Sequence, residues 1–503
     1  MSKLKFASII FLISTLFLKF SSMLRDLVIA HYFGASYIVD AYNAAMIIPN
    51  AFILFMLTGM KDAFVPSYIK YEADHKGKEH LTNIVKGTFI IGFIISFAGA
   101  VFAPVYFPLM YPEFTDSAIN LGIWTAALYF ATVFLVGINA IYEGYFDAQG
   151  KYSFATFSQT VVVLCTIGSA IFLHDIIGGY SLALGYLVGT VISFLIKFMY
   201  LKPRNFINWK QKMDKKEVYS YYKIFLPVGL TIMVGQINLT VNFLFAGQFG
   251  EGVISYLNYA FRLVSIPQAI FGVTTATIIY PILSRAMANN NDALFKTGIE
   301  KGLNVMILLL APTITIMMIL ITEVVGVVYE RGAFGREATL ATSEVAVYYI
   351  GSVLFYSIQV IIAKGFYTLE KGHLILRIGL LSVVINVILN FVFSQLIGYQ
   401  GLALSSSVVG LIYTVLCFII LYRIAGGFNL GFISKEYLKV IAAVIPAGLA
   451  VYFLKSVGGI EGLSNYISVP LLSIIGVVIY LPILFILKSD SLRMVLTRGK
   501  KES

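Results

Sequence analysis

The sequence predicts an all-α polytopic membrane protein with about fourteen transmembrane helices. Its 503 residues are 59% hydrophobic and 12% charged, with a mean hydropathy of +0.87, whereas soluble domains carry about 25% charged residues. The apolar runs continue over about 20 residues, which is the length that crosses a bilayer as a helix. They do not alternate every second residue, as the strands of a transmembrane barrel do.

The apolar runs set the expected helices in order. They lie near 6–32, 38–67, 84–109, 118–145, 153–174, 180–201, 221–247, 254–284, 298–322, 339–366, 373–397, 401–424, 436–456 and 465–487. The net charge of +11 comes from basic residues in short loops between these runs, so it does not indicate nucleic-acid binding. The first run is long, carries charges and lacks a small-residue cleavage site, so we expect no cleavable signal peptide.

Basic residues also predict the orientation. They gather at the start, after every second run and in the tail, whereas the alternate loops carry almost none. The one exception is the segment 328–337, where two arginines are balanced by two glutamates. Because cytoplasmic loops carry the excess of lysine and arginine, we expect both termini to lie in the cytoplasm.

Three pairs of similar segments indicate an internal repeat. They are 33–52 with 249–271, 179–185 with 398–405 and 143–154 with 364–374, all at an offset of about 220 residues, or six runs. An even offset predicts two lobes related by an axis along the membrane normal, with a binding site between them near mid-membrane. The expected parts are an N-lobe (1–202), a basic cytoplasmic linker (203–220), a C-lobe (221–425) and two further helices with a cytoplasmic tail (426–503).

Helix breakers recur at equivalent places in the two repeats. Pro49 and Gly59 lie in the second run, and Pro267 and Gly272 lie in the eighth. Proline removes a backbone hydrogen bond and kinks a helix. Paired breaks in corresponding transmembrane segments predict hinges that line a cavity.

Charged residues inside the apolar runs are the candidate binding residues. Lys19, Arg25, Asp26 and Asp40 belong to the first two runs, and Arg262 to the eighth. A charge near the bilayer centre costs about 2.5–3.5 kcal/mol and usually binds or moves something. Three cations facing one cavity suit a phosphate or diphosphate, with the two aspartates orienting the arginines or gating the outer mouth. Snorkelling of the first-run cations, or structural pairing of Arg262, are the alternatives.

Two pairs of asparagines share helical faces. Asn238 and Asn242 are four residues apart, as are Asn386 and Asn390. Hydrogen bonding between helices is one interpretation. A sodium site made of amide and backbone oxygens is the other.

Signals of catalysis and of cofactors are absent from the sequence. The five histidines show no ligand spacing, and no phosphate-binding glycine loop or serine elbow occurs. Cys165 and Cys417 fall in apolar runs, so we expect them to be small packing residues. We therefore expect no enzyme activity, no metal and no cofactor, with transport driven by membrane potential or a Na⁺ or H⁺ gradient.

Several motifs resemble the MurJ (MviN) family of lipid II flippases. These are L-R-D-x-x-I-A-x-x-F-G-A-x-x-x-x-D-A-Y within 22–42, I-P-N (48–50), A-F-V-P (63–66), Y-A-F-R-L-x-x-x-P (259–267), Y-P-x-L-S-R (280–285), E-R-G-A-F (330–334) and N-x-x-L-N (386–390). They follow in order over nearly the whole chain. The family belongs to the multidrug/oligosaccharidyl-lipid/polysaccharide (MOP) exporter superfamily, with two six-helix lobes and two extra helices.

The resemblance implies a flippase that moves lipid II, the undecaprenyl-diphosphate peptidoglycan precursor, to the outer leaflet by alternating access. Cell-wall biogenesis and cell shape would depend on it. Arg25 and Arg262 match cavity arginines of the family, and Lys19 stands where the family has an earlier arginine. Ile53 and Leu54 stand where the family has a further arginine. The last two runs would form the family's groove for the lipid tail.

The expected partners are a lipid-linked glycan, membrane lipids and the cell-wall synthesis machinery, and we expect a monomer. Because Ile53 and Leu54 remove a cation, the runner-up is an exporter of another polyprenyl-diphosphate-linked unit, from capsule, exopolysaccharide or teichuronic acid. A cation-coupled drug antiporter would need carboxylates in the cavity. A membrane-embedded glycosyltransferase or polymerase would need a catalytic carboxylate and a large outer loop, and a channel would need a filter-like repeat.

Overall fold

The chain forms long helices over nearly all of its described length. The structure is a computed structural model, and it describes residues 3–149, 151–201, 206–289, 291–456 and 462–498. The described residues divide into two compact units, which are considered separately. Unit 1 comprises residues 1–255 with 331–335, and unit 2 comprises 256–330 with 336–503.

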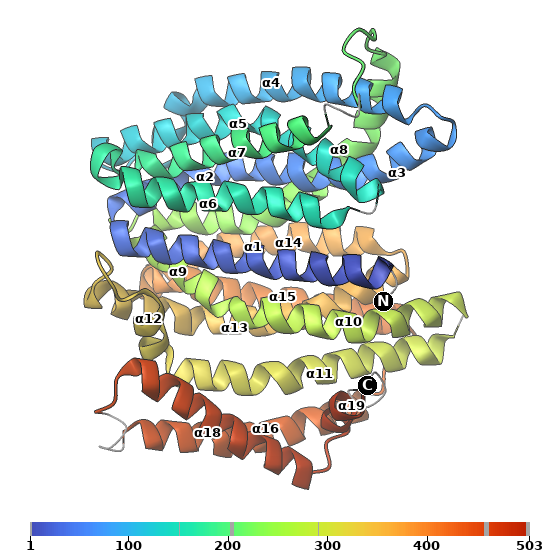
Figure 1. The fold of residues 1–503 in the computed structure, drawn as a ribbon. Helices are drawn as coiled ribbons and strands as arrows, with labels where there is room; N and C mark the ends of the chain where they lie inside the picture. Colours follow the sequence, from blue (N-terminus) through green and yellow to red (C-terminus); the bar gives the residue numbers. More distant parts are fainter. Residues whose placement is uncertain (1–2, 150, 202–205, 290, 457–461, 499–503) are drawn as a thin grey trace. The chain divides into compact units, whose positions relative to one another are not determined.

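Unit 1 contains the first helices of the chain (Figure 1). They are α1 (Lys3–Phe33), α2 (Tyr37–Leu54), the π-helix η1 (Phe55–Gly59), α3 (Met60–Ala73), α4 (Gly77–Met110), α5 (Asp116–Ala148), α6 (Tyr152–Ile177), α7 (Tyr180–Leu201) and α8 (Lys215–Ala246). Within the unit α4 packs on α5, α6 packs on both α1 and α7, and α8 packs along α2, η1, α3 and α4.

Two glycines allow α6 and α7 to pack closely. A Cβ added to Gly189 would lie 2.7 Å from the Cα of Val162, and one added to Gly185 would lie 2.8 Å from the Cα of Thr166. The two glycines are four residues apart on α7, the small-residue spacing that lets membrane helices approach backbone to backbone. This close contact positions the polar side chains near the N-terminal end of α6 and the C-terminal end of α7.

Unit 2 contains the remaining helices, apart from the first residues of α9. They are α9 (Val253–Val264), α10 (Ile266–Ala288), α11 (Asp292–Ile319), α12 (Ile321–Tyr329), α13 (Arg336–Thr368), α14 (Gly372–Ile397), α15 (Gln400–Ile424), α16 (Leu430–Lys455), α18 (Asn465–Ile486) and α19 (Asp490–Arg498). Helix α13 packs on α15, and the pair α16 and α18 packs on α11.

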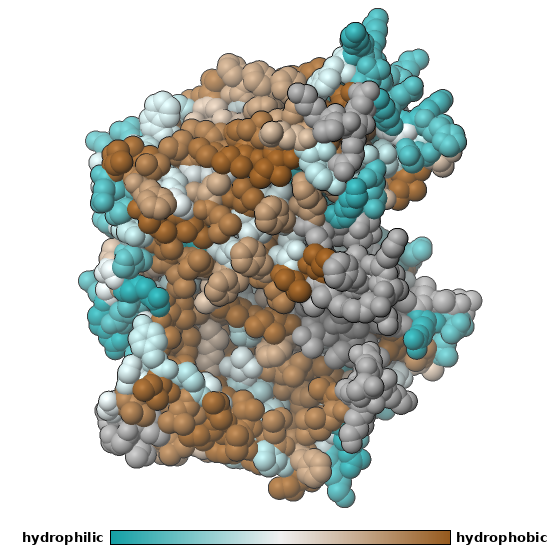
Figure 2. All heavy atoms as spheres, in the orientation of Figure 1, coloured by the Kyte–Doolittle hydropathy of each residue, from teal (hydrophilic) through white to brown (hydrophobic). Residues whose placement is uncertain are grey.

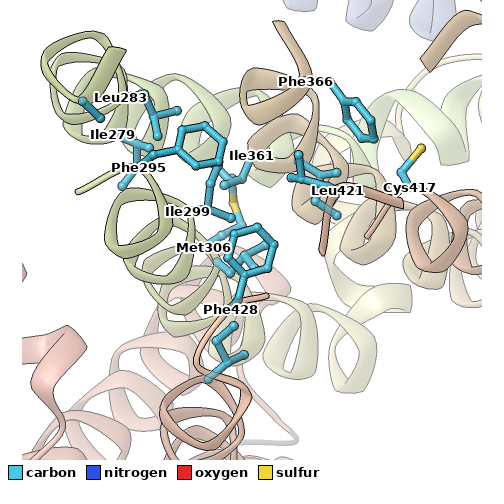
Figure 3. Close-up of a cluster of buried hydrophobic side chains, with 14 of the residues drawn as sticks. Ile279, Leu283, Phe295, Ile299, Met306, Ile361, Phe366, Cys417, Leu421 and Phe428 are labelled. Carbon is cyan, nitrogen blue, oxygen red and sulfur yellow. The ribbon is translucent and has the colours of Figure 1, made fainter. Parts of the chain in front are cut away.

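The largest described cluster of buried apolar side chains lies in unit 2 (Figure 3). Leu283, Phe295, Ile299, Ile361 and Leu421 come from four helices, α10, α11, α13 and α15, and pack with Phe428 from the segment after α15. Hydrogen bonds add to this packing at the C-terminal helices, where the hydroxyl of Tyr480 on α18 donates to the carbonyl of Leu308 on α11 at 2.8 Å.

The predicted fold class is confirmed. Every apolar run coincides with a helix, or with consecutive helices, of the described chain. Among the described residues, eleven helices are long and apolar enough to cross a membrane, and the three other predicted spans correspond to α1, to α8 and to α9 with α10. Figure 2 shows apolar atoms along the helices and hydrophilic atoms gathered at helix ends, as expected for a multi-pass membrane protein.

Candidate functional site

A pocket of about 380 Å³, with both apolar and polar lining residues, lies within unit 1, in the membrane-spanning part of the chain. Helices α1, α2, α5, α6 and α7 contribute its lining. The polar lining includes Arg25, Asn50, Asn139, Glu143, Gln159 and Lys197. Ligand sites of transport proteins concentrate convergent polar groups in such cavities, and this pocket is therefore the candidate site.

Arg25 enters the pocket from α1 beside its own counter-charge. Its Nε and Nη2 donate to one carboxylate oxygen of Asp26, at 3.1 and 3.0 Å. A guanidinium has five N–H donors in a rigid fork. The fork therefore keeps donors for a ligand after it has bound Asp26, and Asp26 fixes its direction as the adjacent positions led us to expect.

Glu143 and Lys197 form a buried ion pair at the same pocket. Lys197 Nζ on α7 donates to Glu143 Oε1 on α5 at 2.8 Å, and their side chains are 0% and 1% exposed. The ammonium also donates to Asn139 Oδ1 at 3.1 Å, and Gln159 Nε2 on α6 donates to Glu143 Oε2 at 2.9 Å. The network links three helices around the pocket.

Our sequence reasoning missed this pair. Glu143 lies within the apolar run 118–145 and Lys197 within 180–201, so both meet the criterion that selected Arg25. Each is close enough to the end of its run to resemble an interfacial anchor. Only the packing of α5 against α7 shows that both charges are buried and turned toward one another.

Of three further residues named from the sequence, two line the pocket and one does not. Lys19 has an exposed side chain on α1, and the described lining of the pocket does not include it. Ile53 and Leu54 do line the pocket. Both side chains are aliphatic, so this part of the pocket wall is apolar.

Asp40 lies apart from Arg25 and binds backbone instead. Its buried carboxylate accepts hydrogen bonds from the N–H groups of Gly252 and Ser255 and from the Ser255 hydroxyl. Nearby, the backbone N–H of Tyr37 donates to Glu251 at 2.9 Å. Asp40 thus holds the segment that follows α8, which fits the gating alternative better than the orienting of an arginine.

Arg262 belongs to α9 in unit 2. Its Nε donates to Asn258 Oδ1 on the same helix at 3.0 Å, and its side chain is partly exposed. Because Arg25 belongs to unit 1, the convergence of Lys19, Arg25 and Arg262 on one ligand stays a prediction.

The structure describes the side chains of three of the four asparagines. The side chain of Asn238 lies outside the described residues, whereas Asn242 is buried on α8. On α14, Asn390 donates to Asn386 at 3.4 Å and Asn386 donates to Ser405 of α15 at 3.3 Å. The bond to Ser405 joins α14 to α15, as expected of hydrogen bonding between helices, whereas the bond between the two asparagines lies within α14. No cluster of three histidine, cysteine or acidic residues that could hold a metal occurs in the searched, described part of the chain.

Two of the four predicted hinges, Gly59 and Pro267, lie at or next to an interruption of an α-helix. Pro49 is buried inside α2, and Gly59 ends the π-helix that interrupts the second span. Pro267 follows the break between α9 and α10, and Gly272 lies within α10. Single-turn π segments inside helices are frequent at functional sites. Movement at these positions is not tested by the structure.

The sequence matches one protein family over most of its length. The family described as "Lipid II flippase MurJ" matches residues 29–468. A lipid II flippase MurJ of Burkholderia cenocepacia is 27% identical over 421 residues, covering 80% of this chain and 81% of the relative. A probable lipid II flippase MurJ of Aquifex aeolicus is 28% identical over 411 residues, covering 78% of each chain.

Two solved structures share the fold of this chain. A structure titled "Lipid II flippase MurJ, inward closed conformation" superposes with a TM-score of 0.82 at 24% identity, covering 97% of this chain and all of the other. An inward-facing multidrug resistance MATE family transporter of the MOP superfamily gives a TM-score of 0.71 at 12% identity, covering 83% and 98%. Both likenesses are evidence for the fold.

Proposed function

The chain belongs to the lipid II flippase MurJ family, and from this membership we propose that it moves lipid II from the inner to the outer leaflet of a bacterial plasma membrane. The observation that carries the proposal is Arg25, a partly buried guanidinium oriented by Asp26 toward a polar pocket. A diphosphate matches the paired donors of a guanidinium. The prenyl chain stays in lipid, so only the polar head needs a protected path.

Further parts of the proposal follow the sequence predictions. Lys19 and Arg262 are proposed as additional ligands of the diphosphate, and both termini are proposed to lie in the cytoplasm. The protein is proposed to work as a monomer without a cofactor and to carry out transport rather than a chemical reaction. Pro49, Gly59, Pro267 and Gly272 are the proposed hinges of an alternating-access cycle.

A second cargo has one specific observation in its favour. Ile53 and Leu54 make one wall of the pocket apolar where the family resemblance implied a further arginine. A lower positive charge would suit another polyprenyl-diphosphate-linked unit, such as a capsule or exopolysaccharide precursor. The rest of the cycle would be unchanged.

The test is rescue of bacteria depleted of their own lipid II flippase. We expect the wild-type chain to restore growth and the amount of lipid II accessible at the outer face, and Arg25→Ala to fail despite normal insertion. Arg336→Ala is the matched control, because Arg336 is an exposed arginine paired with Glu330. If the wild-type protein is inserted and folded but does not rescue growth, the cargo is instead the second candidate, another polyprenyl-diphosphate-linked unit. Full activity of Arg25→Ala would remove the diphosphate role of Arg25.

A further inference from the structure

The hydrogen-bonding groups of the Glu143–Lys197 pair are satisfied by neighbouring side chains. The three donors of the ammonium are directed to Glu143 Oε1, Asn139 Oδ1 and Ser193 Oγ, at 2.8, 3.1 and 3.4 Å. The second oxygen of Glu143 accepts from Gln159. Neither charge is therefore left uncompensated in the membrane-spanning part of unit 1.

Burying such an ion pair costs desolvation free energy, which is difficult to explain if the pair only holds helices together. Desolvating two charges commonly offsets their attraction, so apolar side chains of similar size would hold three helices at least as well. Ionisable groups within membrane spans are instead typical of substrate paths and proton relays. Here both groups also line the pocket that holds Arg25.

We propose that Glu143 is a proton-binding site and that its protonation releases Lys197 to bind an anionic group in the pocket. This inference rests on the proposed function, since it makes the diphosphate of the cargo the anion. A hydronium ion supplies the proton: its O–H bond breaks, a water molecule is released, and an O–H bond forms on the carboxylate. Glu143 is thereby converted from an acceptor for the ammonium into a neutral donor.

The charge of the pocket lining gives the direction of the coupling. With Glu143 ionised, Arg25, Lys197 and Glu143 sum to one positive charge, and with Glu143 protonated they sum to two. An anion therefore binds more tightly to the protonated state. Linkage requires the converse, so the bound anion raises the affinity of Glu143 for the proton.

The other charged groups near Glu143 do not replace this role. Arg25 from α1 and the phenol of Tyr186 from α7 line the same pocket, whereas α2 and α6 contribute the uncharged Asn50 and Gln159. Lys61 from α3 is held by Asp147, one turn after Glu143 on α5, at 2.7 Å. Asp147 thus offers a carboxylate on the same helix that is paired with a different lysine.

The first measurement follows the carboxyl group itself. Purified wild-type protein, Glu143→Gln and Asp147→Asn are placed in lipid nanodiscs, and infrared difference spectra are recorded between an alkaline and an acidic buffer. We expect the carbonyl stretch of a newly protonated buried carboxyl group in the wild type and in Asp147→Asn, and its loss in Glu143→Gln. An unchanged band in Glu143→Gln would overturn the proposal, whatever the cargo.

The second measurement follows the coupling. We expect the affinity of the wild type for lipid II to rise about tenfold over the same pH interval, a typical size for coupled sites. Glu143→Gln should bind tightly at every pH, and Asp147→Asn should behave as the wild type. Equal pH dependence in all three proteins would overturn the coupling.

Together the two measurements distinguish the proposed cargo from the proposed proton site. If the wild type shows the carboxyl band but binds no lipid II, the cargo is wrong and the proton site stands. If Glu143→Gln does not fold, the charge-neutral double variant Glu143→Gln with Lys197→Met takes its place, because it leaves no unpaired charge. The same loss of the band is expected from it.

Discussion

The buried side chain of Asp40 makes three hydrogen bonds to the segment that follows α8. Its carboxylate accepts from two backbone N–H groups and one hydroxyl, and it is 2% exposed. Replacing Asp40 with alanine would leave buried donors unsatisfied, at about 1–3 kcal/mol each. We expect Asp40→Ala to melt at a clearly lower temperature in detergent and to lose most of its transport.

Glu251→Gln is the control for that prediction. Glu251 is exposed and accepts one hydrogen bond from the backbone of Tyr37 at 2.9 Å, and the amide oxygen of glutamine can accept the same bond. Its melting temperature should stay at that of the wild type. If Asp40→Ala and Glu251→Gln melt together, the hydrogen bonds to Asp40 contribute nothing to stability.

At the residue scale, prediction from sequence succeeded where a partner was adjacent in the chain. Arg25 and Asp26 are neighbours, and their pairing was expected and found. The partner of Asp40 lies 215 residues away and the partner of Glu143 lies 54 residues away, so no local pattern reported either one. Their partners depend on how distant helices are rotated and packed.

At the scale of elements, the contact of α6 with α7 supports the pocket. The glycines at 185 and 189 place α7 directly on the backbone of α6. We expect Gly189→Ala to destabilise the protein by about 1–3 kcal/mol, the usual cost of overpacking, since its Cβ would lie 2.9 Å from the carbonyl oxygen of Val162. Thermal unfolding in detergent measures this.

Gly168→Ala is the matched control on the facing helix. A Cβ added there meets no heavy atom within 4 Å. Alanine also favours a helix over glycine by about 1 kcal/mol, so this variant should be as stable as the wild type or more so. A melting temperature for Gly189→Ala equal to that of Gly168→Ala would show that the helices can separate without cost.

At the scale of the whole molecule, the orientation in the membrane is the open prediction. The basic loops predict that both termini lie in the cytoplasm. Single cysteines at Asp74, in the turn after α3, and at Glu113, in the turn after α4, should react from opposite sides with a reagent that does not cross membranes. Cys165 and Cys417 are replaced with alanine to silence them.

The expected result is that Glu113→Cys reacts in intact cells and Asp74→Cys only after the membrane is opened. The reverse pattern would invert the topology, and reaction of both in intact cells would contradict an alternating chain. The lobes predicted from the repeats (1–202 and 221–425) stay a prediction at this scale. The compact units of the structure divide after Ser255, with α8 packed in unit 1.

The sequence by itself determined the membrane class, the order of the helices and the family, because each depends on local information. The length of an apolar run predicts a span, and short motifs along one chain identify a family. The irregularity that ends at Gly59 falls at a predicted helix breaker, since such a residue acts on its own turn.

Only the tertiary structure decided which charges share a pocket. Glu143 and Lys197 were inside predicted spans, yet nothing in either span showed that they face one another rather than lipid or water. The close approach that two glycines allow on α7, together with packing on α5, sets the rotation of these helices. For Glu143 and Lys197 the partner of each charge comes from another helix, so their pairing depends on how α5 and α7 are packed and rotated.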